Sequence, residues 1–104
     1  MFIHETHDGA VVIRLTVDSL DAANTQEFRA RLGGLGLGEA CGATVDCSAL
    51  SFLDSSGVGA LLNVNNRLPD AARPATLENV APDVRTVLEL LRIDRILAVQ
   101  KQAA

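Results

Sequence analysis

The chain has 104 residues, of which 48% are apolar, so it can form one domain around a single hydrophobic core. It contains no Trp or Tyr and only three Phe, and its net charge is −4 at pH 7. Nucleic-acid binding needs basic side chains for the phosphates and often aromatic platforms for the bases, so we expect no nucleic-acid partner. The amino terminus lacks a basic segment followed by an apolar one, and no apolar run reaches about 18 residues. These features favour a cytoplasmic protein without membrane insertion.

The first part of the chain predicts a β-hairpin followed by a helix. Residues 2–6 and 10–16 flank Asp8-Gly9, a pair that favours a tight turn because both residues tolerate positive φ. A helix is then expected to open at Asp21 and to end at Gly33-Gly34. Its buried face carries side chains at helical spacing, namely Thr25, Phe28 and Leu32. The glycine-rich residues 33–39 lack the Lys-Ser/Thr of a P-loop and are expected to form a flexible connection.

The rest of the chain alternates strands and helices. Residues 43–48 form a short apolar run, as expected for a central strand that is covered on both faces. A helix is predicted from Ser55 to Leu68, with inward side chains at Val58, Leu61, Leu62 and Leu68. Further predicted elements are a strand at 75–79, a helix that starts at Ala81-Pro82-Asp83 with its buried stripe at Val84, Val87, Leu88 and Leu91, and a strand at 96–99. This order predicts an α/β fold with a mixed β-sheet of four to five strands and packed α-helices.

The segment Phe52–Gly59, FLDSSGVG in one-letter code, joins a predicted strand to a predicted helix. The start of a helix has unpaired N–H groups and the positive end of the helix dipole, so a Ser there can accept a phosphate. Gly57 and Gly59 remove side-chain bulk and allow a partner to come close. The residue types alone favour a simpler interpretation, a helix cap followed by a tight packing turn, because Asp and Ser are common N-cap residues.

The cysteines and histidines predict no metal or cofactor site. Cys41 and Cys47 have neither the number nor the spacing of a disulfide framework or a zinc site. Cys47 shares the buried face of a strand with Val45, whereas Cys41 is expected to be exposed beside the glycine-rich loop. His4 and His7 stand in the hairpin without further ligands at a suitable spacing.

The run at residues 45–59, VDCSALSFLDSSGVG, resembles the signature of STAS domains and is most similar to bacterial anti-sigma factor antagonists. The pattern is a hydrophobic strand, a short turn with an aromatic residue, then D-S-[ST]-G-[LV]-G and an aliphatic helix. The resemblance extends along nearly the whole chain, including the hairpin, Leu20-Asp21 before the first helix and residues 81–84 at the start of the last. It implies a compact single STAS domain over residues 1–104.

In the family that this sequence resembles, the Ser directly after the Asp is phosphorylated, and that residue corresponds to Ser55. The resemblance implies that the unmodified chain binds an anti-sigma factor, which is also a GHKL-type serine kinase, and so releases the sigma factor. Phosphorylation of Ser55 would block this binding, and a metal-dependent serine phosphatase would reverse it. The kinase binds the ATP, so no cofactor is expected on this chain.

The resemblance places further partner contacts around Ser55, at Asp21, Asp54, Ser56, Gly57 and Gly59. Asp21 and Asp54 are equally open to interpretation as helix caps and as direct contacts. A Cβ at position 57 would intrude on whatever approaches Ser55. If Gly57 has helical dihedrals, its replacement by Ala is expected to leave stability unchanged or slightly raised.

Two other classes of function remain open at this point. A STAS domain can also be a non-switching subunit of a transporter or signalling complex, for example in phospholipid transport, and an intact D-S-S-G motif counts against this only mildly. An enzyme with Ser55 or Ser56 as nucleophile is disfavoured, because the only histidines lie in the hairpin and no G-x-S-x-G motif is present.

Overall fold

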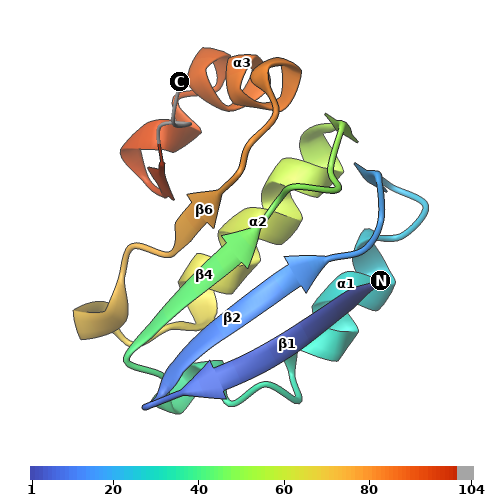
Figure 1. Ribbon diagram of the computed structural model, residues 1–104. Helices are drawn as coiled ribbons and strands as arrows, with labels where there is room; N and C mark the ends of the chain where they lie inside the picture. The colour runs from blue at the N-terminus through green and yellow to red at the C-terminus, as the bar shows by residue number, and fades with distance from the viewer. Residues whose placement is uncertain (101–104) are drawn as a thin grey trace.

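The computed structural model describes residues 1–100 and contains a five-stranded sheet with helices packed on one face (Figure 1). The strands lie in the order β1-β2-β4-β6-β7. Their bounds are Phe2–His7, Ala10–Leu15, Gly42–Asp46, Thr76–Glu78 and Ala98–Val99. β1 and β2 are antiparallel, whereas the other neighbouring pairs are parallel. The sheet is therefore mixed, and the predicted α/β fold is confirmed.

The turn between β1 and β2 is made by Asp8 and Gly9, as predicted. Both residues have positive φ, 52° and 83°. The hairpin register is His7 opposite Ala10 and Phe2 opposite Leu15, so the two strands pair over their full length.

Helices α1 (Thr25–Leu32) and α2 (Ser55–Arg67) cover one face of the sheet. They lie behind the sheet in Figure 1, and within residues 1–100 no helix crosses the face of β1, β2 and β4 that is turned to the viewer. Alternate side chains of β2 and β4 are buried toward the helices, namely Val11, Ile13, Leu15, Ala43 and Val45. Strand 43–48 is central as predicted, but its predicted cover on both faces is wrong, since Thr44 and Asp46 on the open face are only partly buried.

Helix α3 (Pro82–Leu90) packs near the short strand β5 (Phe52–Leu53) at the carboxyl edge of the parallel strands. Ala81 is its extended N-cap and Pro82 occupies its first turn, as predicted. The stripe of this helix is shorter than predicted, because Leu91 is 53% exposed. The helix ends at Leu90, and Arg92 has a left-handed φ of 58°, so the chain leaves the helical path directly after Leu91.

The glycine-rich connection after α1 is anchored at one point. It contains the 3₁₀ turn Leu37–Glu39, and Leu37 is buried in the core. Two further 3₁₀ turns span Asp70–Ala72 and Ile93–Arg95. In the part of the chain that the structure describes, no helix is both long and apolar enough to cross a membrane.

A second, two-stranded parallel sheet forms between β3 (Ser19–Leu20) and β5 (Phe52–Leu53), which the sequence did not predict. Ser19 stands opposite Phe52, and Leu20 stands opposite Leu53. The helix expected to open at Asp21 begins instead at Thr25, because Asp21 closes a turn: its carbonyl oxygen accepts from the N–H groups of Asn24 at 3.1 Å and Thr25 at 3.0 Å.

Candidate functional site

The Phe52–Gly59 segment lies where β5 passes into α2, and Asp54 caps the start of that helix. The backbone of Asp54 is extended, and its Oδ1 accepts a hydrogen bond of 3.0 Å from the N–H of Gly57. The N–H groups of Ser55 and Ser56, in the first turn, have no acceptor within the helix. The helix start therefore presents backbone donors beside two serine hydroxyls.

Asp21 and Asp54 are brought together by the register of the small sheet, since each directly follows one of its two paired strands. The second carboxylate oxygen of Asp54, Oδ2, accepts from the N–H of Ala22 at 3.3 Å. The backbone N–H of Asp54 donates to the carbonyl oxygen of Leu20 at 3.3 Å. The carboxylate of Asp21 accepts from the N–H of Ala23 at 2.9 Å. Both aspartates therefore stabilise local backbone, and a contact of either with a partner stays a prediction.

Asn24 is a residue of this site that the sequence reasoning missed. Its Oδ1 accepts from the N–H of Asp21 at 3.0 Å, and its Nδ2 donates to the carbonyl oxygen of Ser19 at 2.8 Å. These bonds fold residues 19–24 into the turn that delays the start of α1. An Asn directly before a helical stripe is a typical cap signal, and it would have been found had the helix been expected to begin at Thr25.

The two serines of the segment have different surroundings. Ser55 is exposed at the first position of α2, whereas Ser56 is half-buried. Ser56 lines a shallow recess against α1 with Thr25, Gln26 and Arg29. A partner can therefore reach the hydroxyl of Ser55 more freely than that of Ser56.

Gly57 is buried, and the space around it is closed, which contradicts the expected tolerance of a side chain there. A Cβ on this residue would lie 2.2 Å from the carbonyl oxygen of Leu20 and 2.9 Å from the Cβ of Leu53. Both distances are shorter than any normal contact, so the glycine lets α2 pack directly on the small sheet. The glycine therefore serves internal close packing, which argues against the expected neutral effect of Gly57→Ala on stability, and a contact of Gly57 with a partner stays a prediction.

Gly59 has a different neighbour. A Cβ at this position would lie 2.9 Å from Nη2 of Arg29, which is the end of a flexible side chain. The guanidinium of Arg29 therefore rests on α2 at a point where α2 has no side chain. This contact between α1 and α2 had no signal in the sequence.

An exposed apolar side chain precedes the serines. Phe52 is 55% exposed, although it belongs to a paired strand. With Ser51 and Leu53 it lines a recess whose other side is formed by Val84 and Val87 of α3. The surface beside Ser55 thus includes apolar groups that water solvates poorly.

Asp46 is the last residue of β4, and its carboxylate links β4 to β2 and to the residue that follows β6. Its carboxylate accepts from the N–H of Ser48 at 3.0 Å, from Nδ2 of Asn79 at 3.1 Å and from Nε of Arg14 at 3.3 Å. Burial acts to raise the pKa of Asp46, but the hydrogen bonds from Asn79, Ser48 and Arg14 outweigh it and hold the pKa below its ordinary value. Asp46 therefore fixes the turn that leads from β4 toward β5.

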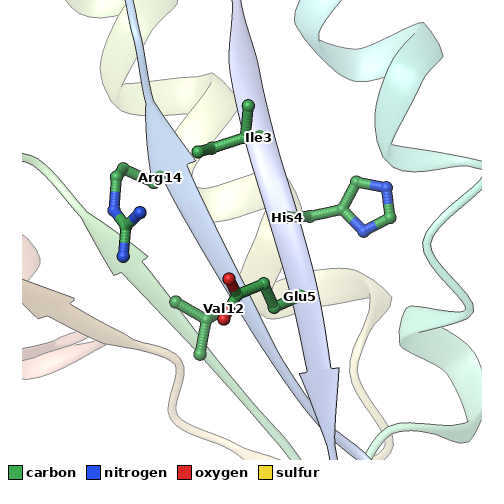
Figure 2. A pocket seen from close by; sticks show the side chains of 5 residues that line it. All are labelled: Ile3, His4, Glu5, Val12 and Arg14. Atoms are coloured by element: carbon green, nitrogen blue, oxygen red, sulfur yellow. The ribbon is translucent and has the colours of Figure 1, made fainter.

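The open face of the β1–β2 hairpin carries a shallow hollow lined by Ile3, His4, Glu5, Val12 and Arg14 (Figure 2). Figure 2 shows His4 directed away from the other four side chains. Within residues 1–100 no three His, Cys, Asp or Glu side chains are grouped as metal ligands.

The two cysteines differ in exposure as predicted. Cys41 is exposed, and Cys47 is 1% exposed. Burial, with a smaller contribution from the neighbouring Asp46 charge, raises the pKa of the Cys47 thiol to about 12. Cys47 is therefore protonated and unreactive at neutral pH.

The sequence model of the STAS domain matches residues 2–103. No curated protein matches the chain in sequence.

Several solved structures share the fold. An anti-sigma factor antagonist from Mycobacterium paratuberculosis superposes with a TM-score of 0.81 at 19% identity, over 98% of this chain and 86% of that chain. The anti-sigma factor antagonist SpoIIAA in its unphosphorylated form has a TM-score of 0.70 at 28% identity, over 99% of this chain and 90% of that chain. The phosphorylated form of SpoIIAA, a Bacillus cell fate determinant, gives 0.69 at 28% identity, over 98% and 93% of the two chains.

A domain of a transporter is also similar in fold. The murine anion transporter Slc26a9 matches with a TM-score of 0.66 at 17% identity, over 86% of this chain and 17% of that chain. At that identity the match shows the fold alone.

Proposed function

This chain belongs to the STAS domain family, and from that premise we propose that it is an anti-sigma factor antagonist whose binding is switched by phosphorylation of Ser55. In this proposal the chain acts in the cytoplasm by binding a partner protein, and it is not an enzyme. The observation that carries this proposal is the exposed Ser55 hydroxyl at the first position of a helix whose start is fixed by Asp54. Support also comes from SpoIIAA, which is 28% identical and exists in unphosphorylated and phosphorylated forms.

The chemistry of the modification suits the position of Ser55. A partner serine kinase transfers the γ-phosphoryl group of its bound ATP to the Ser55 oxygen, the hydroxyl proton is released and ADP leaves. The phosphate adds about −1.5 to −2 charges and three acceptor oxygens. Free N–H groups in the first turn and the helix dipole favour this negative charge, so the modified domain stays folded.

The same phosphate opposes binding of the partner. In the unmodified chain, the anti-sigma factor docks over Ser55 and the exposed Phe52, and the sigma factor is released. A phosphate brings negative charge beside Asp21 and Asp54, and it has to be desolvated before a partner can cover it. Disrupting a buried polar contact in an interface costs about 2–5 kcal/mol, which lowers affinity by about thirtyfold or more. A metal-dependent serine phosphatase then restores the binding form.

The acceptor serine is tested by incubating the protein with native cell extract and ATP, followed by peptide mass spectrometry. We expect phosphate on Ser55 in the wild type and in Ser56→Ala, and no labelling of this segment in Ser55→Ala. Ser56→Ala is the matched control, because it removes the neighbouring hydroxyl and leaves Ser55 in place. Labelling of Ser55→Ala equal to that of the wild type would refute the assignment.

The switch itself is tested by affinity capture from the same extract. Unmodified protein should retain a serine kinase of the ATP-binding GHKL type, and Ser55→Asp should retain at least about thirtyfold less. Thr6→Asp, which adds the same charge on exposed β1, is the control and should bind like the wild type. If Ser55→Asp captures the kinase as well as Thr6→Asp does, the charge mechanism is wrong.

A further inference from the structure

Arg29 of α1 lies against the start of α2, next to the serine segment. Its Nη2 is 2.9 Å from the point where a Cβ of Gly59 would stand, and it lines the same recess as Ser56. The carbonyl oxygen of Arg29 accepts from Nη2 of Arg67 at 3.0 Å, so the backbone that carries this side chain is tied to α2. The guanidinium therefore lies against the first two turns of α2, at the end of a side chain that can still rotate.

Helix geometry relates this position to Ser55. Gly59 follows Ser55 by four residues, which places it about one turn along the helix and about 40° around it. Side chains at this spacing have Cβ atoms about 5–6 Å apart, and the Cα–Cβ bond of a helical residue tilts toward the amino end. A group that occupies the side-chain space of Gly59 thus lies next to a group carried by Ser55.

The guanidinium of Arg29 has no partner within residues 1–100. Three other arginines of residues 1–100 pair with carboxylates, Arg14 with Asp46, Arg31 with Glu27 and Arg73 with Asp70, whereas Arg92 and Arg95 resemble Arg29 in having no side-chain partner there. Arg29 has neither a carboxylate nor a hydrogen-bond acceptor in the same residues, although it rests on a fixed surface. An Arg side chain offers a planar set of donors that matches the oxygens of a phosphate.

We infer that Arg29 is the internal counter-ion of a phosphate carried by Ser55. Gly59 provides the space that the guanidinium of Arg29 occupies in the unmodified chain. This inference rests on the proposed modification of Ser55. The guanidinium needs only rotation of its own side chain to reach the phosphoryl oxygens, so the modified chain holds its phosphate on its own surface without refolding. Arg29 is a positioning residue for the modified state and has no part in the transfer of the phosphoryl group.

The test uses full-length protein with phosphoserine incorporated at position 55 during synthesis, so that no kinase or anti-sigma factor is needed. Phosphorus NMR follows the second ionisation of the phosphate, with a pKa near 6 for a free phosphoserine. A neighbouring cation favours the doubly charged form. We therefore expect Arg29→Gln to raise this pKa by about 0.5 units or more at low salt, with a smaller effect at high salt.

Arg31→Gln is the matched control, because Arg31 is an exposed arginine on the same helix that pairs with Glu27. It should leave the phosphate pKa at the wild-type value. The carboxylates of Asp21, Asp54 and Asp83, which surround the segment, are present in every variant and cancel in the comparison.

An equal phosphate pKa in the wild type, Arg29→Gln and Arg31→Gln would overturn the inference. So would equal shifts in the two variants, since these would report only net charge. If the shift is specific to Arg29 but the unmodified protein captures no kinase, the pairing stands and the proposed function fails.

Discussion

Replacing Gly57 by alanine would push a Cβ atom into the backbone of β3. The new atom would lie 2.2 Å from the carbonyl oxygen of Leu20, 3.0 Å from the carbonyl carbon and 2.9 Å from the Cβ of Leu53. Non-bonded atoms are most stable at about 3.5–4.0 Å, so the Leu20 oxygen would have to move by more than about 1 Å. That oxygen also accepts the N–H of Asp54, so the movement disturbs the cap of α2.

The cost follows from these distances. Overpacking of this kind destabilises proteins by about 1–3 kcal/mol, and loss of the Leu20–Asp54 hydrogen bond adds about 1 kcal/mol. Alanine in a helix recovers at most about 1 kcal/mol relative to glycine. We therefore expect Gly57→Ala to lower the free energy of unfolding by about 2 kcal/mol.

Gly59→Ala is the matched control, since it makes the same change in the same helix. Its Cβ meets only the end of the Arg29 side chain, which can rotate away. The helix propensity of alanine should then dominate, with stability unchanged or raised by up to about 1 kcal/mol.

Urea denaturation followed by far-UV circular dichroism measures both variants, because the chain has no Trp or Tyr for fluorescence. With a slope of about 1–3 kcal/mol per molar urea, the midpoint of Gly57→Ala should fall by about 1 M. The midpoint of Gly59→Ala should not fall. A midpoint for Gly57→Ala at or above the wild-type value would refute the packing argument, as would equal losses in the two variants.

Two further predictions concern carboxylates near the segment. Asp54→Ala removes the acceptor of the Gly57 and Ala22 N–H groups and should lower the free energy of unfolding by about 1–2 kcal/mol. Asp54→Asn keeps a cap acceptor and should lose much less stability. Equal losses in the two variants, measured by urea denaturation, would argue against a capping role. Asp46→Asn should cost about 1 kcal/mol at pH 7. Because the pKa of Asp46 is lower in the folded chain than its ordinary 3.8, this contribution is complete above the unfolded value and is lost as pH falls through the folded value. The unfolding free energies of wild type and Asp46→Asn should therefore converge in acid, and a difference that stays constant as the pH falls well below 3.8 would contradict this.

Local patterns predicted most of the elements because they depend on neighbours in sequence. Asp8-Gly9 favours the hairpin turn through positive φ, and Pro69 ends the helix that begins after Asp54. The same patterns placed the start of α1 four residues early, because Asp21 is as good a cap as Asn24 and only the hydrogen bonds of the turn distinguish them. They also overextended the α3 stripe to Leu91, since nothing in the periodicity predicts a left-handed Arg92.

The sequence by itself determined the strands of the five-stranded sheet along the chain and the capped helix start at Asp54. Each depends on residue types within one or two turns of one another. Only the tertiary structure decided that Leu20 closes the space around Gly57 and that Arg29 occupies the space above Gly59. These contacts join residues about thirty or more positions apart in the sequence. The contact of Leu20 with Gly57 depends on paired strands of two residues, which are too short to leave a sequence pattern. Both contacts also depend on a glycine whose function is the absence of a side chain.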